Sequence, residues 1–360
     1  RDDWVIHMDE ETRIEEETVK YIYAHCAREE AEVRAGKKRY GNIGQGVILY
    51  GTSKYPDNYL TTLADSIRVS DDFGKFRTQY QLGDPFIGMH GSFVVRQTAI
   101  EADVSFDHGL AGSITEDAYF ALAASGVGVK FSWIDAFMYE QSPFSVLDFI
   151  KQRARWFGGL WLVVLARNIP LSKRLTLAFM TCSWLCSPIV LLAMTLSMLV
   201  TTERTAEGIS IVGFVGAASC WGYLLGFVWT FKLEHGYVRY AVLFFAQLAF
   251  QPVFAVMETA GIVYAIMFPP IKGFYIVQKE GGIKQQEAAE MDGSGYSSGA
   301  SSAMSGSTCE TECSYVLPVN DDDVLEIQKR RNAPTFFIRP NFFTGRDEAV
   351  ELHVRQYAEF

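Results

Sequence analysis

Two acidic residues near the start of the chain have the types and spacing of a metal-binding pair. Asp9 and Glu11 lie two positions apart, directly after the apolar run 4–8, and such a run is typical of a buried strand that ends in a loop. Hard cations such as Mg²⁺ prefer oxygen ligands and commonly share them between carboxylates and substrate phosphates. The same acids could instead only cap the helix that follows. A metal site that bridges a nucleotide diphosphate and a helix cap are both open at this point.

A second acidic signal is the triplet Thr115-Glu116-Asp117, which opens a predicted helix over residues 113–124. Asp117 could act as a general base that activates a hydroxyl for attack on an anomeric carbon, with Glu116 beside it as a second candidate catalytic carboxylate. The plainer interpretation is a helix start, because Thr is a good N-cap residue and acids are favoured in a first helical turn.

The third signal combines an amide, a guanidinium and an indole on one helix face. Gln152, Arg155 and Trp156 stand at positions i, i+3 and i+4 of a predicted helix over 146–167, so they are neighbours on its surface. Arg can hold a diphosphate through paired hydrogen bonds, and an indole offers a flat face to a sugar ring. The alternative is an ordinary interfacial helix with Trp and Arg at headgroup depth.

The elements around these signals alternate between strands and helices. Apolar runs between glycines and turns predict strands, and spaced apolar positions predict helices. Such alternation favours an α/β layer with a mainly parallel sheet. The predicted strands are 4–8, 46–51, a segment within 87–96, and 129–139; the predicted helices are 12–35, 58–80 and 113–124.

Long apolar stretches follow the segments that carry the three signals. A bilayer core requires roughly 20 apolar residues per helix, so three stretches qualify as spans, after an interfacial helix within residues 141–170. Basic residues before the first stretch and in the loop 232–239 favour a cytosolic position for residues 1–170. A re-entrant piece near 251–252 remains an alternative for the third stretch. The predicted spans are 175–200, 209–231 and 240–268.

Composition excludes several classes of protein. The net charge of -10 over 360 residues argues against nucleic-acid binding, which needs a basic surface. Six cysteines without a Cys-x-x-Cys pair do not indicate a disulfide framework or a zinc site. Residues 271–315, rich in Gly and Ser, are expected to be a disordered linker, and 316–360 a tail without a chemical motif. The chain opens on charged residues and then an apolar run, so we expect it to begin inside a domain.

Taken in order before membrane-type stretches, the three signals resemble the Asp-x-Asp, Thr-Glu-Asp and Gln-x-x-Arg-Trp series of membrane-embedded inverting glycosyltransferases with the GT-A fold. Cellulose, chitin and hyaluronan synthases belong to that group. Intervening segments narrow the likeness to the egghead-type β-1,4-mannosyltransferases of glycosphingolipid synthesis. Those segments are TTLADSIRVSDDFGKFR, GSFVV, VSFDHGLAGSITEDAYFA and YEQSPFSVLDFIKQRARW.

The resemblance implies a GT-A α/β domain in residues 1–140, truncated at its N-terminus, and a reaction in which GDP-mannose donates mannose to a glucosyl lipid such as glucosylceramide. It implies that Asp9 and Glu11 hold Mn²⁺ or Mg²⁺ and that Asp117 is the base. The diphosphate and acceptor would be bound by Gln152, Arg155 and Trp156, and Gly91-Ser92 would line the acceptor side. The implied location is the endoplasmic reticulum or Golgi membrane, with the catalytic domain in the cytosol.

Two features depart from the family pattern. Glu11 replaces the second Asp, which keeps a carboxylate on a longer side chain, and the strands that bind the nucleotide base would precede residue 1. The remaining alternatives are a processive β-glycan synthase, which needs a polysaccharide channel through the membrane, and a catalytically silent membrane scaffold. A transporter is disfavoured, since Glu258 is the only ionisable residue predicted inside the spans.

Overall fold

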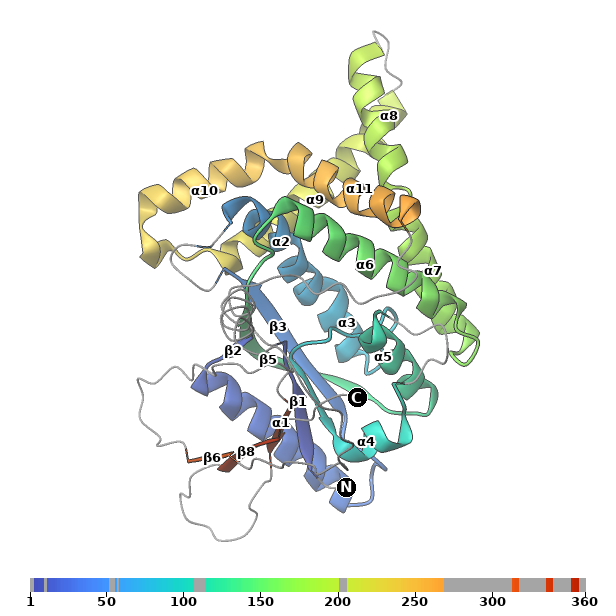
Figure 1. Ribbon diagram of the computed structural model, residues 1–360, viewed down its shortest axis with the longest axis vertical. Helices are drawn as coiled ribbons and strands as arrows, with labels where there is room; N and C mark the ends of the chain where they lie inside the picture. Colours follow the sequence, from blue (N-terminus) through green and yellow to red (C-terminus); the bar gives the residue numbers. More distant parts are fainter. Residues whose placement is uncertain are drawn as a thin grey trace, which may run out of the picture.

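The computed structural model describes residues 3–9, 12–51, 56, 58–106, 114–200, 206–268, 313–316, 335–338 and 351–355. A central sheet carries helices along its faces, and the later helices gather at one end of it, at the top of Figure 1. Glu11 and the linker 271–312 lie outside the described residues.

Three strands of the sheet share one direction and therefore end at one edge. They are β1 (Trp4–His7), β3 (Ile43–Tyr50) and β5 (Phe131–Glu140). β3 and β5 pair in parallel, and β4 (Val94–Gln97) runs antiparallel between β3 and β1. The short β2 (Arg13–Ile14) pairs antiparallel with β5. Ligands of open α/β sheets bind at the carboxyl edge, so the ends of β1, β3 and β5 mark the place to look for a site.

The sheet is mixed rather than mainly parallel as the sequence predicts. β4 is the cause, because the loop before it already lies at the carboxyl edge: Ser92 Oγ accepts a hydrogen bond from the Asp9 backbone N–H at 3.2 Å. A strand that starts at this edge must run opposite to one that ends there. The loop turns at Phe93, a non-glycine residue with φ of 54°, and alternation of apolar residues carries no signal for such a turn.

Helices cover both faces of the sheet. α1 (Glu16–Arg34) packs on β5, and the core between them includes the buried Ile22, Cys26 and Met138. On the other face a chain of short helices precedes β4, and two more follow it. These are α2 (Tyr59–Asp71), a π-helical turn (Asp72–Phe76), α3 (Arg77–Gln81), α4 (Thr98–Asp103) and α5 (Glu116–Gly126).

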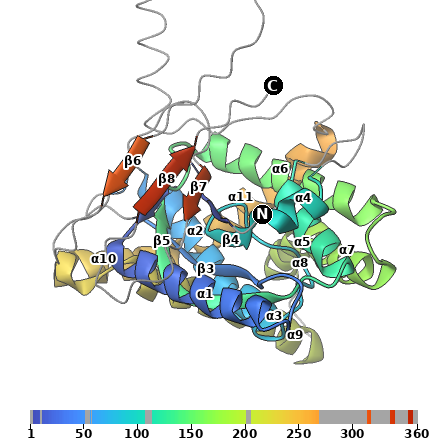
Figure 2. The same cartoon turned by 90° about the horizontal axis from the view of Figure 1, so that it is seen from below.

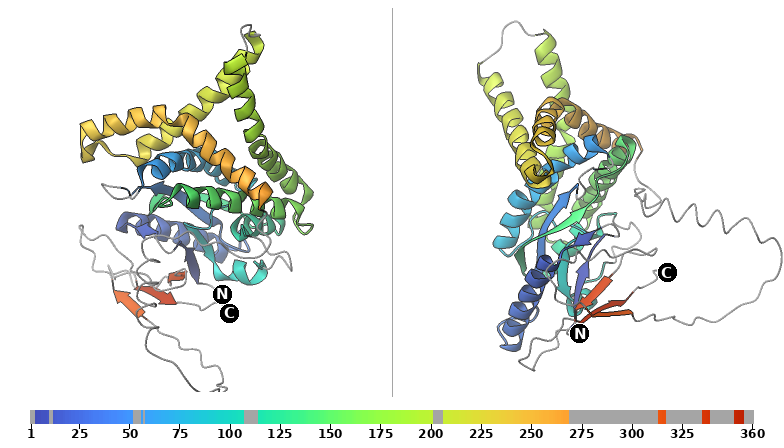
Figure 3. Two further views of the ribbon diagram at one scale, coloured as in Figure 1. Left: turned by 45° about the horizontal axis from the view of Figure 1, so that its top comes forward. Right: turned by 90° about the vertical axis from the view of Figure 1, so that its left-hand side faces the viewer.

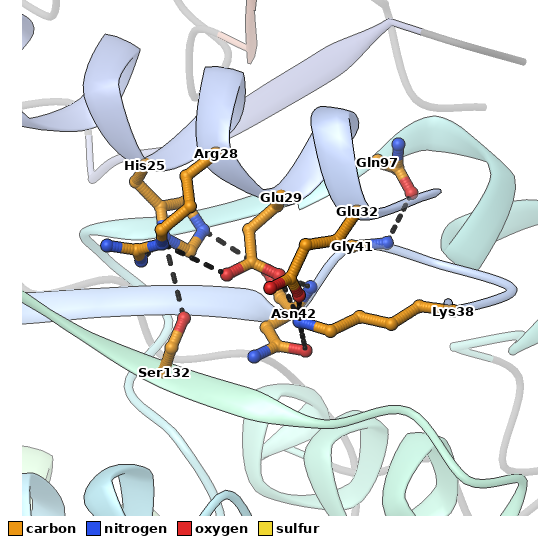
Figure 4. A network of polar contacts seen from close by, with 9 residues as sticks. All are labelled: His25, Arg28, Glu29, Glu32, Lys38, Gly41, Asn42, Gln97 and Ser132. Carbon is orange, nitrogen blue, oxygen red and sulfur yellow. Dashed lines mark hydrogen bonds and ion pairs between the residues drawn. The ribbon is translucent and has the colours of Figure 1, made fainter. Parts of the chain in front are cut away.

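A buried polar network fastens α1 to the amino end of β3, as Figure 4 shows. Glu29 accepts from the Lys38 ammonium at 2.8 Å and from the Asn42 backbone N–H at 3.0 Å. His25 Nε2 lies 3.1 Å from the Asn42 carbonyl oxygen. Since these partners come from the helix and from the loop before β3, the network fixes α1 against the sheet.

The motif helix α6 (Val146–Leu165) begins at an N-cap, Ser145, whose hydroxyl accepts from the Asp148 N–H at 3.0 Å. The chain then continues through apolar helices that project from the sheet (Figure 3). These are α7 (Leu171–Leu185), α8 (Ser187–Val200), α9 (Ala206–Thr230), α10 (Tyr237–Ala249) and α11 (Gln251–Met267), with a 3-10 turn at Leu233–His235.

Fewer membrane-type helices are found than the three spans predicted from sequence. Within the described residues, one stretch, Leu171–Ala193, is long and apolar enough to cross a bilayer, and α10 with α11 forms a second if the 57° bend between them is part of one span. That bend coincides with the break considered at 251–252. α9 overlaps the predicted span 209–231 but packs on α2, where a Cβ added at Gly226 would lie 1.7 Å from the Ser66 carbonyl oxygen.

Three strands from the tail extend the sheet beyond β1. They are β6 (Cys313–Val316), β7 (Thr335–Ile338) and β8 (Glu351–Arg355), and they lie beside one another in Figure 2. β7 pairs antiparallel with β1, so β1 has a neighbour on each side. Residues 313–315, which the composition assigns to a disordered linker, belong to β6. The pairing is long-range in sequence, and local composition does not predict it.

Candidate active site

The carboxyl edge of the sheet carries a chain of hydroxyl and carboxylate groups. Thr12 Oγ1 lies 3.0 Å from Ser92 Oγ and donates to Glu140 Oε1 at 3.2 Å. Ser92 also accepts from the backbone N–H of Asp9. The chain thus joins the loop after β1, the loop before β4 and the end of β5. The acidic loop and the Gly91-Ser92 turn, 80 residues apart in sequence, are held as one structure.

Asp9 is exposed at this edge and is not a helix cap. α1 begins at Glu16 with Glu15 at the N-cap position, so the helix starts well beyond Asp9. The Asp9 carbonyl instead accepts from the Thr12 N–H at 2.9 Å and closes a turn. Asp9 therefore does not cap α1, and its charge acts on Asp117, Glu140 and Arg155. Glu11, its predicted partner, lies outside the described residues.

Asp117 lies in the first turn of α5, beside the Gly91 turn. Its Oδ1 accepts from the Ala118 N–H at 2.7 Å, and its Oδ2 lies 3.4 Å from the position that a Cβ of Gly91 would occupy. Burial, with the charges of Glu116 and Asp9, raises the pKa of Asp117 to about 7, while Arg155 acts in the opposite sense. A carboxylate with this pKa is suited to take a proton at neutral pH.

A second carboxylate at the edge was not singled out in the sequence. Glu140, at the end of β5, is buried, and burial with the charge of Asp9 raises its pKa to about 7, against Arg68 and the hydroxyls of Ser92 and Thr12. The available signal was its place at the end of a predicted strand. An acid in that position looks like any strand terminus until the neighbouring loops are known.

Close backbone packing brings the Thr-Glu-Asp and Gln-x-x-Arg-Trp segments together. Thr115 occupies the N-cap position of α5 but makes no side-chain capping bond. A Cβ added at Gly159 of α6 would lie 2.7 Å from Thr115 Cγ2. A Cβ at Gly88, which has φ of 106°, would lie 2.8 Å from Ala118. The start of α5 is therefore enclosed between α6 and the loop before β4, and glycine is required at both contacts.

Arg155 brings the positive charge of the motif helix to the acids. Burial lowers its pKa, and the charges of Asp9, Glu116 and Asp117 act against that shift. All three acids therefore lie within electrostatic range of this guanidinium, as a site for an anionic diphosphate and its metal requires.

Gln152 and Trp156 lie in the same helix but have different immediate neighbours. The buried Gln152 accepts from Arg153 Nη1 at 3.0 Å. The Trp156 ring lies under two guanidinium groups, with the carbons of Arg68 and Arg153 each 4.4 Å from its centroid. Of the three residues predicted on one face, the structure brings Arg155 to the acids and sets the other two against Arg153. Neither Arg68 nor Arg153 was singled out by sequence.

Asp9 is an exposed carboxylate at the edge that could contribute to the binding of a hard divalent ion. Within the described residues, no group of three or more His, Cys, Asp or Glu side chains could hold a metal. Asp9 supplies carboxylate oxygens only, and Mg²⁺ or Mn²⁺ in nucleotide enzymes is commonly held by one or two carboxylates together with substrate phosphates. The exposed Asp9 carboxylate is consistent with that mode of binding and not with a closed, all-protein cage.

Comparisons with known proteins identify the family of the chain. Residues 4–233 match the family described as glycosyl transferase family group 2. The chain is 36% identical over 280 residues to the protein named β-1,4-mannosyltransferase egh of Drosophila melanogaster, covering 77% of this chain and 59% of that one. It is also 36% identical, over 281 residues and with the same coverage, to the proteins named β-1,4-mannosyltransferase bre-3 of Caenorhabditis elegans and Caenorhabditis briggsae. The chain thus spans less than two thirds of these relatives.

Proposed function

Because this chain belongs to glycosyl transferase family group 2, we propose that it transfers mannose, with inversion, from GDP-mannose to a hydroxyl of a lipid-linked acceptor such as glucosylceramide. The observation that carries the proposal is Asp117, a carboxylate with a pKa of about 7 beside the Gly91 turn and within electrostatic range of Asp9 and Arg155. The relatives named as β-1,4-mannosyltransferases support the choice of sugar.

Each side chain at the edge has a role in this reaction. Asp117 takes the proton of the acceptor hydroxyl as its oxygen attacks the anomeric carbon, and the bond from that carbon to the diphosphate breaks. Arg155 binds the departing diphosphate, whose charge grows in the transition state. Burial, followed by the negative charge of Glu116, raises the pKa of Asp117 and so makes it a stronger base.

The remaining groups position the reactants. The Gly91-Ser92 turn lines the side from which the acceptor enters, and Gln152 and Trp156 complete the binding surface of the motif helix. Asp9 and Glu11 would hold Mn²⁺ or Mg²⁺. When bound, such an ion neutralises charge on the diphosphate.

The acceptor class follows from the apolar helices beside the site. α6, which carries Arg155, packs against α7 and α11, and α7 begins the stretch Leu171–Ala193 that is apolar enough to cross a bilayer. A site next to such helices is placed to accept a lipid whose sugar headgroup reaches the sheet edge. We propose an endoplasmic reticulum or Golgi membrane, with residues 1–170 on the cytosolic side.

A donor screen tests the proposal. Vesicles that contain the protein and glucosylceramide are supplied separately with GDP-mannose, UDP-glucose and UDP-N-acetylglucosamine, and the lipids are analysed by mass spectrometry. The expected product is glucosylceramide carrying one added mannose, formed only from GDP-mannose. Elongated products would indicate a processive β-glycan synthase instead, and absence of any transfer would indicate a silent scaffold.

A further inference from the structure

Arg153 lies between the motif residues Gln152 and Arg155, and neither the family motif nor the proposed reaction uses it. Its side chain is 2% exposed, among the most buried charged groups of the chain. Burying a charge is costly unless the charge is paired and hydrogen-bonded. The position therefore needs a physical account beyond that of an ordinary helix residue.

Every side-chain nitrogen of Arg153 has a partner, and the partners lie on three helices. Nε donates to Glu258 of α11 at 2.7 Å, and Nη1 donates to Gln152 of α6 at 3.0 Å. Nη2 donates to Asp65 of α2, which is fully buried. The planar fork of an arginine can satisfy three directions at once, whereas the point charge of a lysine cannot. Glu258, the one ionisable residue predicted inside the spans, thus pairs with Arg153.

Arg153 also contacts Trp156, another motif residue of its helix. Its guanidinium carbon lies 4.4 Å from the centroid of the Trp156 ring and 4.0 Å from that of Phe149. Cation–π contacts of this kind gain strength when the cation is desolvated. One buried side chain therefore holds both the amide oxygen of Gln152 and the ring of Trp156.

The same side chain lies at a close contact between α11 and α6. A Cβ added at Gly261 would lie 2.6 Å from Arg153 Cβ and 3.3 Å from the Ile150 carbonyl oxygen. Apolar residues of both helices, Ala154 and Ile262 among them, form one buried cluster beside this contact. α11 is the second half of the bent helix pair that begins with α10. A shift of α11 would therefore be transmitted to Arg153 directly.

We propose that Arg153 is a positioning residue that sets the geometry of Gln152 and Trp156 and couples it to the bent pair α10–α11. The proposal rests on the proposed function only in that Gln152 and Trp156 belong, with Arg155, to the surface that binds the diphosphate of the donor. Donor binding then depends on how α11 sits against the motif helix. In the proposed reaction the nucleotide sugar binds at the sheet edge and the lipid acceptor approaches along the apolar helices. Arg153 contacts residues of both regions.

The test compares Arg153→Lys, which keeps the charge but not the fork, with Val163→Ala as the matched control. Val163 is buried on the same helix and belongs to a different apolar cluster, so its truncation loosens α6 without touching Arg153. Affinity for GDP-mannose is measured by calorimetry on the detergent-solubilised full-length protein. We expect Arg153→Lys to weaken binding about tenfold or more, and Val163→Ala to lower the thermal midpoint with binding within about twofold of the parent.

A double variant separates positioning from general stability. If Arg153 acts through Gln152, then Arg153→Lys combined with Gln152→Ala should bind no more weakly than the weaker-binding single variant, because coupled residues are non-additive. Normal affinity in Arg153→Lys, or fully additive losses in the double variant, would overturn the proposal.

Hydrogen exchange provides a readout that needs no donor. Glu258→Gln removes the charge of the α11 partner alone, and we expect faster exchange in residues 149–156 of α6 as well as around residue 258. Faster exchange confined to α11 would overturn the coupling. If the parent chain binds a nucleotide sugar other than GDP-mannose, the donor assignment fails, and the same comparison of variants is made with that nucleotide.

Discussion

Asp117 has the most informative environment in the chain at the scale of single residues. It is brought beside Gly91 by the packing of α5 under the loop before β4, and burial together with the charges of Glu116 and Asp9 raises its pKa to about 7. Asp9 and Arg155 complete a set of charges that a diphosphate and its metal would engage. The chemistry at this scale is set by which loops meet, since none of these residues is close to the others in sequence except Glu116.

The raised pKa of Asp117 predicts the direction of the pH dependence. A general base must be deprotonated, so kcat/KM should rise with pH through about 7 and level off above it. Glu116→Gln removes a neighbouring negative charge and should move this midpoint to lower pH. Burial also raises the pKa of Glu140 to about 7, but Glu116 is not among the causes of that shift. A midpoint that Glu116→Gln leaves in place would assign the titration to another group.

The second prediction at the residue scale concerns the metal. Excess chelator should abolish transfer, and Mn²⁺ or Mg²⁺ should restore it, since the diphosphate needs a hard cation shared with carboxylates. Asp9→Ala should bind the ion more weakly. At the ion concentration that saturates the parent, it should therefore recover only a small part of its activity. The measurement is activity against added ion for parent and variant, with the thermal midpoint of Asp9→Ala as the folding control. Undiminished transfer in chelator would contradict the assignment of Asp9.

At the scale of elements, contacts between distant segments could not be predicted from the sequence pattern. The order of the three signals, the alternating strands and helices, and the helix that carries the motif residues could all be predicted, because each depends on local spacing. The reversal of β4 at Phe93, the place of Glu140 and the ion pair between Arg153 and Glu258 could not, because each depends on which distant segments meet.

Gly159 offers a direct test of how the elements are assembled. A Cβ at this position would lie 2.7 Å from Thr115, so Gly159→Ala should push α6 away from α5 and separate Arg155 from Asp117. We expect a loss of about 1–3 kcal/mol in the free energy of unfolding, the usual range for overpacking, and a larger loss in kcat than the stability change explains.

Gly74→Ala is the matched control for this change, because a Cβ there meets nothing within 4 Å. It should leave kcat unchanged and keep or raise the thermal midpoint, since Ala is favoured over Gly in helical segments. Equal kcat in the two variants would show that the contact between α5 and α6 does not position the site.

The network that fastens α1 to β3 (Figure 4) predicts an acid sensitivity of the fold. Burial lowers the pKa of His25 from 6.5 to about 4, so the unfolded chain takes up this proton more readily than the folded one. The contribution of His25 to stability should be complete above pH 6.5 and fall by about 1.4 kcal/mol per pH unit toward pH 4. Thermal unfolding between pH 6.5 and 4.5 measures how stability depends on pH in the parent and in His25→Gln. The two slopes should differ by the contribution of one proton, and identical slopes would contradict this prediction.

On the scale of the whole molecule, α6 lies between the sheet edge and the apolar helices, because it packs against α5 and also against α7 and α11. Within the described residues, one stretch is apolar enough to cross a bilayer and the bent pair α10–α11 supplies a second at most, where three spans are predicted. α9, which overlaps one of the predicted spans, packs on α2, and an apolar run alone does not predict that contact. The pairing of β7 with β1 was unpredictable for a similar reason, since strand partners are chosen across the whole chain.

Transfer of labelled mannose by the parent and by Asp117→Asn tests the central claim most directly. Both proteins are placed in vesicles containing glucosylceramide and Mn²⁺, and a rapid-quench measurement records the first turnover from GDP-mannose. We predict a single mannose on the lipid for the parent, and for Asp117→Asn a rate lower by at least about 10²-fold with nearly unchanged affinity for GDP-mannose. Transfer by Asp117→Asn at close to the parent rate would contradict the assignment of Asp117 as the base and the site built around it.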